Sequence, residues 1–268
     1  MTFSDLALSQ RLERAEGFSC AQYAEARRRQ FPDSAAESIQ CGGAFAVFDG
    51  VSSPCTQTFC LGLFEELPPA TLDTIEAFFR SHAAPILHEV SPFAGIDAQR
   101  LLCDRGYRPL ELSSVLYRAV QLLATPDRNS ITVRIIGPEE FELWSRISAR
   151  GWTHDHPELM EFMIEFGAVT AARNQTACFL AEVDGQPGAA GALSIHEGVA
   201  LFAGSSTVPE LRRRGLQAAL LEARMRYAVN QGCDIAMMVA LPGSDSQRNA
   251  ERKGFHIAYT RTKWQLAS

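Results

Sequence analysis

The segment Thr207–Ala218, with the sequence TVPELRRRGLQA, carries the most information about fold and chemistry. It joins a run of strand type, Val199 to Thr207, to the helical pattern that follows Pro209. Where a helix starts, several backbone N–H groups lack intrahelical partners, and the helix dipole adds about half a positive charge. Three consecutive arginines beside this end are unfavourable unless an anion compensates, and Gly215 lets that anion approach the backbone closely. The segment therefore predicts a phosphate or pyrophosphate site, with a solvated basic helix start as the competing interpretation.

Such an anion site has to be local, because the chain as a whole is acidic. Its 25 Lys and Arg residues stand against 31 Asp and Glu, a formal charge of -6 that disfavours a sequence-independent grip on nucleic acid. With 46% hydrophobic and 21% charged residues, the composition is that of a folded protein. The N-terminus lacks the pattern of a secretory signal, and no apolar run approaches the roughly 20 residues of a membrane helix. We therefore expect a soluble, cytoplasmic protein that binds neither nucleic acid nor membranes.

The cysteines indicate neither a disulfide framework nor a metal site. There are seven of them, an odd number, and none forms the Cys-x-x-Cys spacing that holds zinc. Free cysteine is a common buried small hydrophobe, and thiols stay reduced in the cytosol. We expect no bound metal.

A linker divides the 268 residues into two predicted domains, 1–126 and 127–268. The linker is the sequence ATPDRNS at residues 124–130, which is rich in turn-forming residues. In the second half, Asp184-Gly185 predicts a type I′ hairpin turn. Helices are expected after Pro138, Pro157 and Pro209 and over residues 246–253, and strands over 131–136, 177–183, 186–195, 199–207, 235–241 and 255–265.

The first half carries a fainter copy of the closing part of the second. After an opening helix over residues 4–30, its order is helix 71–82, strand 85–90, short helix 97–104 and strand 110–118. The sequence LCDRGY at residues 102–107 echoes AERKGF at residues 250–255. Self-similarity in a fixed order is typical of duplicated units, so we predict an internal repeat.

These features resemble the GNAT superfamily of acyl-CoA-dependent N-acyltransferases. The family signature is Arg or Gln, two residues, Gly, one residue, then Gly or Ala, after a β-bulged strand. Arg212 and Gly215 match it, while Gln217 stands at the final small position. The segment Ser246 to Phe255 resembles a second motif of the family that faces CoA. The resemblance implies an α/β fold with a mixed sheet, in tandem with a degenerate first copy.

The resemblance also implies which residues bind acetyl-CoA. Backbone groups of Thr207 and Val208 would pair with pantetheine, the amides from Arg213 to Ala218 would hold the pyrophosphate, and Ser246 and Asn249 would form the far wall. Phe255 is expected in the core. The residues implied to contact acetyl-CoA are therefore Thr207, Val208, Arg212, Arg213, Arg214, Gly215, Leu216, Gln217, Ala218, Ser246 and Asn249.

The implied reaction is direct attack of a primary amine, on a small-molecule acceptor, on the thioester of acetyl-CoA in a ternary complex. A backbone N–H at the bulge would stabilise the oxyanion. Many relatives protonate the thiolate with a tyrosine, but the matching residue here is Ala250, and residues 199–207 contain no carboxylate. The catalytic acid and base are therefore left unassigned. A second hypothesis follows from the same two features: a non-catalytic acyl-CoA sensor.

Four residues are candidates to face the acceptor: His154, Asp155, Ser205 and Ser206. A histidine of ordinary pKa can accept the proton of an ammonium group. The competing interpretation is that Asp155 or His156 caps the following helix, and that the serines bond to the local backbone.

The first half is expected not to bind CoA. Its matching junction, Leu61 to Pro69, reads LGLFEELPP and has two glutamates and two prolines where the second half has arginines and free amides. Proline donates no N–H, and carboxylates repel phosphate. A structural or acceptor-shaping role is expected for this half.

Overall fold

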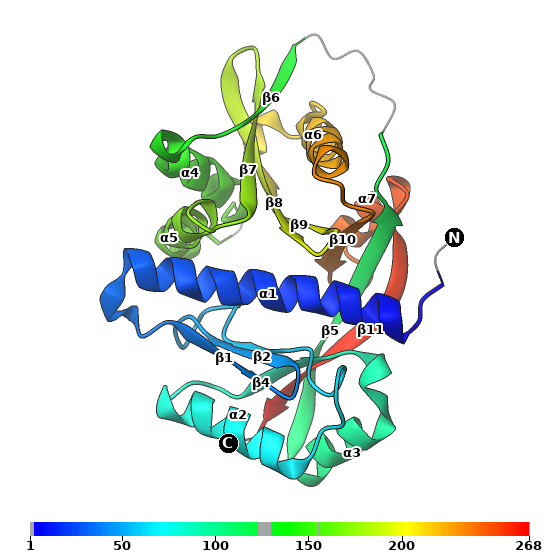
Figure 1. Cartoon of the computed structure of the whole chain (residues 1–268). Coiled ribbons are helices and arrows are strands. Elements are labelled where there is room, and N and C mark those ends of the chain that lie inside the picture. Colours follow the sequence, from blue (N-terminus) through cyan, green and yellow to red (C-terminus); the bar gives the residue numbers. More distant parts are fainter. Residues whose placement is uncertain (1–2, 123–129, 155, 268) are drawn as a thin grey trace. The chain divides into compact units, whose positions relative to one another are not determined.

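The computed structural model describes residues 3–122, 130–154 and 156–267 (Figure 1). Its contacts group into two compact units: unit 1 comprises residues 1–118 and 237–268, and unit 2 comprises residues 119–236. The predicted boundary between residues 126 and 127 lies outside the described residues. Residues 237–268 group with unit 1 because the last strand, β11 (His256–Leu266), pairs with β5 (Tyr107–Ala119) and β4 (Leu87–Val90).

Unit 1 is a mixed sheet with helices on both faces. The strand order is β1-β2-β3-β4-β11-β5, with β3 and β4 parallel and the other neighbouring pairs antiparallel. The remaining elements of the unit are α1 (Leu6–Gln30), β1 (Glu37–Cys41), β2 (Ala44–Phe48), β3 (Gln57–Phe59), α2 (Pro69–Ser81), α3 (Gly95–Asp104) and α7 (Asp245–Arg252).

Strand β2 shows why this sheet is covered on both sides. Successive side chains of a strand point to opposite faces, and all five residues of β2 are buried. Ala44, Ala46 and Phe48 pack in one cluster with the apolar side chains of α2. Phe45 and Val47 pack in a second cluster with Ala24 of α1. Figure 1 shows α1 and α2 on opposite sides of the strand.

A buried ionic cluster fastens α1 to the sheet of unit 1. Glu13, on α1, is 0% exposed. One of its carboxylate oxygens lies 3.0 Å from Nη1 of Arg261, and the other accepts a hydrogen bond of 2.9 Å from the hydroxyl of Tyr259. The same arginine contacts Glu16 and Glu89. Burial, together with repulsion by these two carboxylates, outweighs the attraction of Arg261 and raises the pKa of Glu13 to about 7.

This pKa predicts that unit 1 becomes less stable as the pH rises towards neutrality. The folded state holds the proton of Glu13 at pH values where the unfolded state, with a carboxyl pKa of about 4.3, has released it. The contribution is present below about pH 4 and is lost on passing pH 7, for a total of about 4 kcal/mol. We expect Glu13→Gln to flatten the pH dependence of the unfolding free energy, measured by urea denaturation from pH 5 to 8. Parallel curves for the variant and the parent would contradict the assignment.

Unit 2 is built on an antiparallel meander. Strands β6 (Ile131–Ile135), β7 (Thr176–Val183), β8 (Gln186–His196) and β9 (Val199–Thr207) pair in that order. Figure 1 shows α4 (Phe141–Trp152) and α5 (Met160–Ala171) on one face and α6 (Leu216–Asn230) on the other. Trp144 of α4 is buried, and its indole N–H donates to the carbonyl of Phe179 on β7 at 2.9 Å. The division between the units falls within β10 (Ile235–Ala240).

Most predicted elements are confirmed. The repeat is visible in the element order, because β3-α2-β4-α3-β5 in the first half matches β9-α6-β10-α7-β11 in the second. Both residues of the predicted hairpin turn have positive φ, 54° for Asp184 and 75° for Gly185. One boundary differs: α6 starts at Leu216, not directly after Pro209, because Gly215 ahead of it has a φ of 91° and cannot continue a helix backwards. Among the described residues, no helix is long and apolar enough to cross a membrane.

Candidate functional site

The site begins at a bulge in β9. Ala190 of β8 pairs with Ser206, and Ala192 pairs with Ala203, so the single Gly191 opposes two residues, Gly204 and Ser205. Gly204 has a φ of 60°, the left-handed conformation that a glycine in such a bulge adopts readily. The β-bulged strand expected from the family resemblance is therefore present.

The turn that follows β9 is anchored by apolar side chains. Val208 and Leu211 are buried, and the amide of Val208 donates to the carbonyl of Gly188 at 2.9 Å. A Cβ at position 188 would lie 2.4 Å from a methyl carbon of Leu211, so Gly188 and Leu211 pack closely at this turn. The N–H of Val208 is therefore engaged within the protein, and the role of the Thr207 and Val208 backbone groups towards pantetheine stays a prediction. Burial of these two side chains leaves the arginines that follow exposed.

The backbone between this turn and α6 is unusual. Arg213 and Gly215 both have left-handed φ values, 63° and 91°, and such residues are components of the backbone concavities that bind anions. The amides of Ala218 and Ala219 both donate to the carbonyl of Gly215 at 3.1 Å. Within the described residues, the amides of Arg213, Arg214, Leu216 and Gln217 have no hydrogen-bond acceptor. Of the predicted pyrophosphate donors, Ala218 is therefore already engaged, while these four are available.

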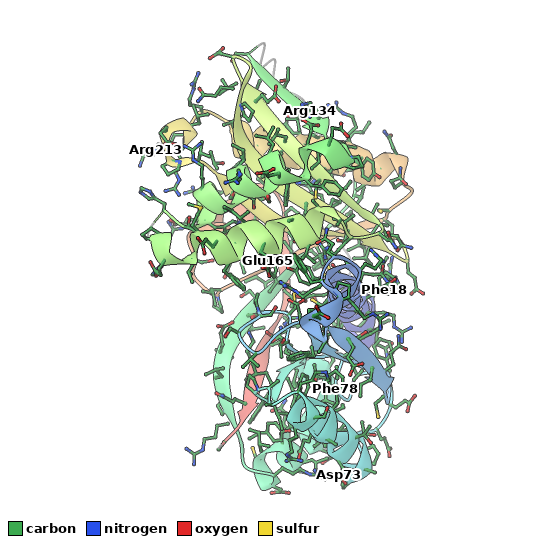
Figure 2. All side chains as sticks on the ribbon, turned by 90° about the vertical axis from the view of Figure 1, so that its left-hand side faces the viewer. Phe18, Asp73, Phe78, Arg134, Glu165 and Arg213 are labelled. Atoms are coloured by element: carbon green, nitrogen blue, oxygen red, sulfur yellow. The ribbon has the colours of Figure 1, made fainter. Side chains whose placement is uncertain are left out.

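The three arginines have different surroundings. Arg212 donates to two main-chain carbonyls, those of Gly151 and Thr207, and so ties the end of α4 to the end of β9. Arg214 forms an ion pair of 3.0 Å with Asp184 in the β7–β8 turn. The guanidinium of Arg213 has no partner among the described residues, and Figure 2 shows this residue at the outer edge of unit 2. Arg213 is therefore the arginine with its full charge available to a ligand.

Gln217 and Thr207 are joined directly. The side-chain amide of Gln217 donates to Oγ1 of Thr207 at 2.7 Å, and Gln217 is exposed. Leu216, the first residue of α6, is 1% exposed and anchors the start of the helix. The unusual glutamine of the signature thus bridges the end of β9 to the first turn of α6.

Ser205 and Ser206 do not present free hydroxyl groups to an acceptor. Oγ of Ser206 donates to the carbonyl of Ser148 at 2.9 Å. Oγ of Ser205 is buried and has no hydrogen-bond partner among the described residues. Gly151 packs directly on this strand, because a Cβ there would lie 2.6 Å from Cβ of Ser206 and 2.8 Å from the amide nitrogen of Thr207. Ser206 therefore ties β9 to α4 through a main-chain carbonyl, whereas Ser205 makes no hydrogen bond to the backbone in the described part of the chain.

The bridge between α4 and α5 is only partly described. Asp155 lies outside the described residues. His154 is exposed, and no contact involves its ring in the described part of the chain. His156 precedes the 3-10 turn Pro157–Leu159 without capping it, and its Nδ1 lies 3.2 Å from Oε1 of Glu158. The roles of His154 and Asp155 towards an acceptor stay predictions.

The second predicted CoA motif lies on α7, which belongs to unit 1. Ser244, not Ser246, caps this helix, with its hydroxyl accepting from the amide of Gln247. Ser246 and Asn249 are exposed and three positions apart, so they share one face of the helix. Ala250, at the position where many relatives have tyrosine, is 5% exposed. Phe255 is 1% exposed, as expected for a core residue.

The matching junction of the first half has a different design. Helix α2 starts at Pro69, with Pro68 as its cap, so two of the amides at this helix start are absent. Arg105 donates to the carbonyl of Pro69 and pairs with Asp73 in the first turns of the helix. Glu65 and Glu66 are exposed nearby in the sequence. This junction therefore has carboxylates and prolines without N–H groups where the matching junction of the second half has arginines and main-chain N–H donors.

The sequence analysis did not identify Gly188, Gly191 and Gly204, nor the buried Arg224, as residues of this site. Isolated glycines inside a predicted strand are a usual sign of a bulge or a close approach, so Gly191 and Gly204 carried a signal. Arg224 shares a helix face with Leu220, four residues before it, and is 2% exposed. In the described part of the chain, no group of three or more His, Cys, Asp or Glu residues could hold a metal ion.

The donors present fit a diphosphate. The turn ahead of α6 combines three kinds of positive group: four free amides, the exposed guanidinium of Arg213, and the N-terminal end of a helix of 15 residues. Residues 211–218 contain no Asp or Glu that would repel an anion. The turn can therefore bind the diphosphate of a nucleotide through its main chain and Arg213.

Comparison with known proteins places this site in a wider context. Residues 139–255 match the model of the acetyltransferase (GNAT) family. A GCN5-related N-acetyltransferase from Kribbella flavida is similar over 93% of this chain and 96% of its own, with a TM-score of 0.63 and 20% identity. A tandem GNAT protein from the clavulanic acid biosynthesis pathway is similar over 100% and 98%, with a TM-score of 0.59 and 12% identity.

A third solved structure, a GCN5-related N-acetyltransferase from Sphaerobacter thermophilus, is similar over 87% of this chain and 76% of its own, with a TM-score of 0.54 and 14% identity. No curated protein matches the chain by sequence. The structural matches extend over nearly the whole chain, so they concern both units.

Proposed function

We propose that this protein transfers an acetyl group from acetyl-CoA to a primary amine of a small molecule. Residues 139–255 match the model of the acetyltransferase (GNAT) family, and solved GNAT structures, one of them a tandem GNAT protein, share the fold over nearly the whole chain. Members of this family take the acyl group from acyl-CoA. The amine attacks the thioester carbonyl with both substrates bound, the C–S bond breaks, and the CoA thiol leaves.

The observation that carries this proposal is the turn ahead of α6. Arg213, with no partner in the described structure, and the free amides of Arg214, Leu216 and Gln217 supply donors for the diphosphate of CoA. Upstream, the bulge at Gly204 interrupts the ladder of β9 and turns main-chain groups away from β8. Binding both substrates in register supplies much of the rate of such a transfer without a dedicated base.

The direct test is release of CoA thiol from acetyl-CoA, followed with a thiol reagent across a panel of small primary amines. We expect release that depends on both substrates, with acetylated amine formed in equal amount. Calorimetry measures the dissociation constant of CoA in parallel with this assay. Absence of CoA binding at millimolar concentration would overturn the assignment.

Replacement of Arg213 tests the role of the free guanidinium. A charge-assisted hydrogen bond contributes about 1.5 kcal/mol, so we expect Arg213→Ala to weaken CoA binding roughly tenfold, as measured by calorimetry. Arg214→Ala is the matched control, because its guanidinium is already paired with Asp184. An equal loss in both variants would show that charge alone, and not the free position of Arg213, accounts for the effect.

One observation supports the second hypothesis, an acyl-CoA sensor. The buried methyl group of Ala250 leaves the usual position of the proton donor without a titratable group. If CoA binds tightly and no amine of the panel releases thiol above the rate without protein, the sensor is favoured. If release is observed, water or a group of the acceptor itself protonates the thiolate.

A further inference from the structure

A fully buried arginine lies directly beneath the bulge of β9. Arg224, on α6, is 2% exposed, and no carboxylate pairs with it among the described residues. Burial lowers the pKa of Arg224 to about 10, so the guanidinium still carries its charge at neutral pH. A buried charge without a counter-ion is costly, and its retention needs a structural reason.

The guanidinium donates to main-chain carbonyls of its own helix and of both strands at one end of the bulge, with Nε donating to the carbonyl of Leu220 at 3.3 Å. Its Nη1 donates to the carbonyl of Ala192 on β8 at 3.2 Å and to that of Ala203 on β9 at 3.5 Å. Ala192 and Ala203 are the last pair in register before the ladder shifts. Buried carbonyls beside an interrupted ladder need donors, and this side chain supplies one that reaches both strands.

The neighbouring residues are shaped around this side chain. A Cβ at position 191 would lie 3.1 Å from Cζ of Arg224, so Gly191 leaves the space that the guanidinium occupies. Phe202 lies beneath the charge, with 5.0 Å between its ring centroid and Cζ. The same Cβ would lie 3.2 Å from the buried hydroxyl of Ser205, which places the second bulged residue beside the guanidinium.

The contact to Ala203 also acts on the bulge itself. The carbonyl of Ala203 and the N–H of Gly204 belong to one peptide group, and Gly204 is the left-handed residue of the bulge. A donor on the carbonyl side of a peptide group fixes its plane and strengthens its N–H as a donor. The charged donor thus holds the orientation of the main chain at the point where the ladder opens.

We propose that Arg224 is a positioning residue for acyl transfer, which holds the bulge of β9 in its open geometry by bridging the carbonyls of Ala192 and Ala203. The claim that Arg224 supports acyl transfer rests on the proposed function. The claim that Arg224 holds the bulge does not depend on that function. Arg224 does not touch the diphosphate site, because Arg213 and the amides of that site lie two turns away at the start of the helix.

The test compares Arg224→Met, Arg224→Lys and the control Arg226→Met, an exposed position on the same helix. Two readouts are needed: amide hydrogen exchange of residues 202–206, and kcat beside the dissociation constant of CoA. Methionine removes the donors while keeping an unbranched side chain, and lysine keeps a donor.

For Arg224→Met we expect exchange in residues 202–206 to rise at least tenfold, with exchange in β7 unchanged. We also expect kcat to fall about tenfold with the dissociation constant of CoA within threefold of the parent. Arg224→Lys should recover part of both, and Arg226→Met should resemble the parent. Unchanged exchange at the bulge, or equal loss of CoA binding and kcat, would overturn the proposal. If the parent protein releases no thiol, the proposed function fails, and the exchange data still decide whether Arg224 holds the bulge.

Discussion

Replacing Gly215 by alanine is expected to weaken CoA binding about 100-fold. Gly215 caps α6 with a φ of 91°, a conformation that costs a residue with a Cβ roughly 1–2 kcal/mol. The chain would relieve this strain by rotating the turn, which moves the amides of Leu216 and Gln217 away from a common ligand. Loss of two charge-assisted hydrogen bonds of about 1.5 kcal/mol each accounts for the factor.

The other end of the same helix supplies the control. Gly232 follows α6 with a φ of 72°, and apart from its chain neighbours no heavy atom of the described residues lies within 4 Å of the position of its missing Cβ. Gly232→Ala therefore carries a similar backbone cost without a ligand nearby. Calorimetry with CoA and thermal unfolding of both variants separate the two effects. If both variants bind CoA equally, the geometry of Gly215 is not what forms the site.

Gly151→Ala is expected to lose about 2 kcal/mol of stability and most of the activity. The added methyl group would meet Cβ of Ser206 at 2.6 Å and the main chain of Thr207 at 2.8 Å, and overpacking of this kind typically costs 1–3 kcal/mol. Main chain cannot move aside as a flexible side chain can. Either α4 or the end of β9 must shift, and both carry the turn that holds the ligand.

The measurement is urea unfolding together with kcat for acetyl transfer. Gly167→Ala on α5 is the matched control, because its Cβ would also meet a serine of α4 at 2.8 Å, but that serine is Ser145, six residues before Gly151. We expect a comparable loss of stability there with activity of the folded protein retained. Equal activity in the two variants would contradict the link between α4 and the site.

Much of unit 2 could be predicted because its local signals agree. The Asp184-Gly185 turn, the strand Val199 to Thr207 and the stop at Gly232 each follow from residue chemistry, and each was found where expected. The buried face of α6 was predicted only in part. Leu216 and Leu220 are buried as apolar periodicity indicates, but Arg224 is buried with them, and a charged residue gives no apolar signal in the sequence.

The three strands that open the first half were not predicted. β1, β2 and β3 have at most five residues each, and β2 is apolar throughout because helices cover it on both faces. Such a run lacks the alternation that identifies a half-buried strand. The association of β11 with β4 and β5 was equally beyond local patterns, because strand pairing between distant segments depends on tertiary contacts.

The candidate site was predicted as a segment but not as a set of contacts. The helix start, Gly215 and the three arginines pointed to an anion, yet only the fold distinguishes Arg213 from its neighbours, because Arg212 binds carbonyls of the main chain and Arg214 binds Asp184. Competition of this kind depends on residues far away in the sequence. The amide of Val208 likewise donates a hydrogen bond to a distant residue, at the carbonyl of Gly188, and the sequence does not show this.

The central claim is that the turn ahead of α6 binds the diphosphate of acyl-CoA through its main chain. A titration of isotope-labelled protein with CoA, followed by the amide resonances, tests it directly. We expect saturable shifts that are largest for the amides of Arg213, Arg214, Leu216 and Gln217, and much smaller shifts when pantetheine, which lacks the diphosphate, replaces CoA. Saturation with CoA that leaves these four amides unmoved would contradict it.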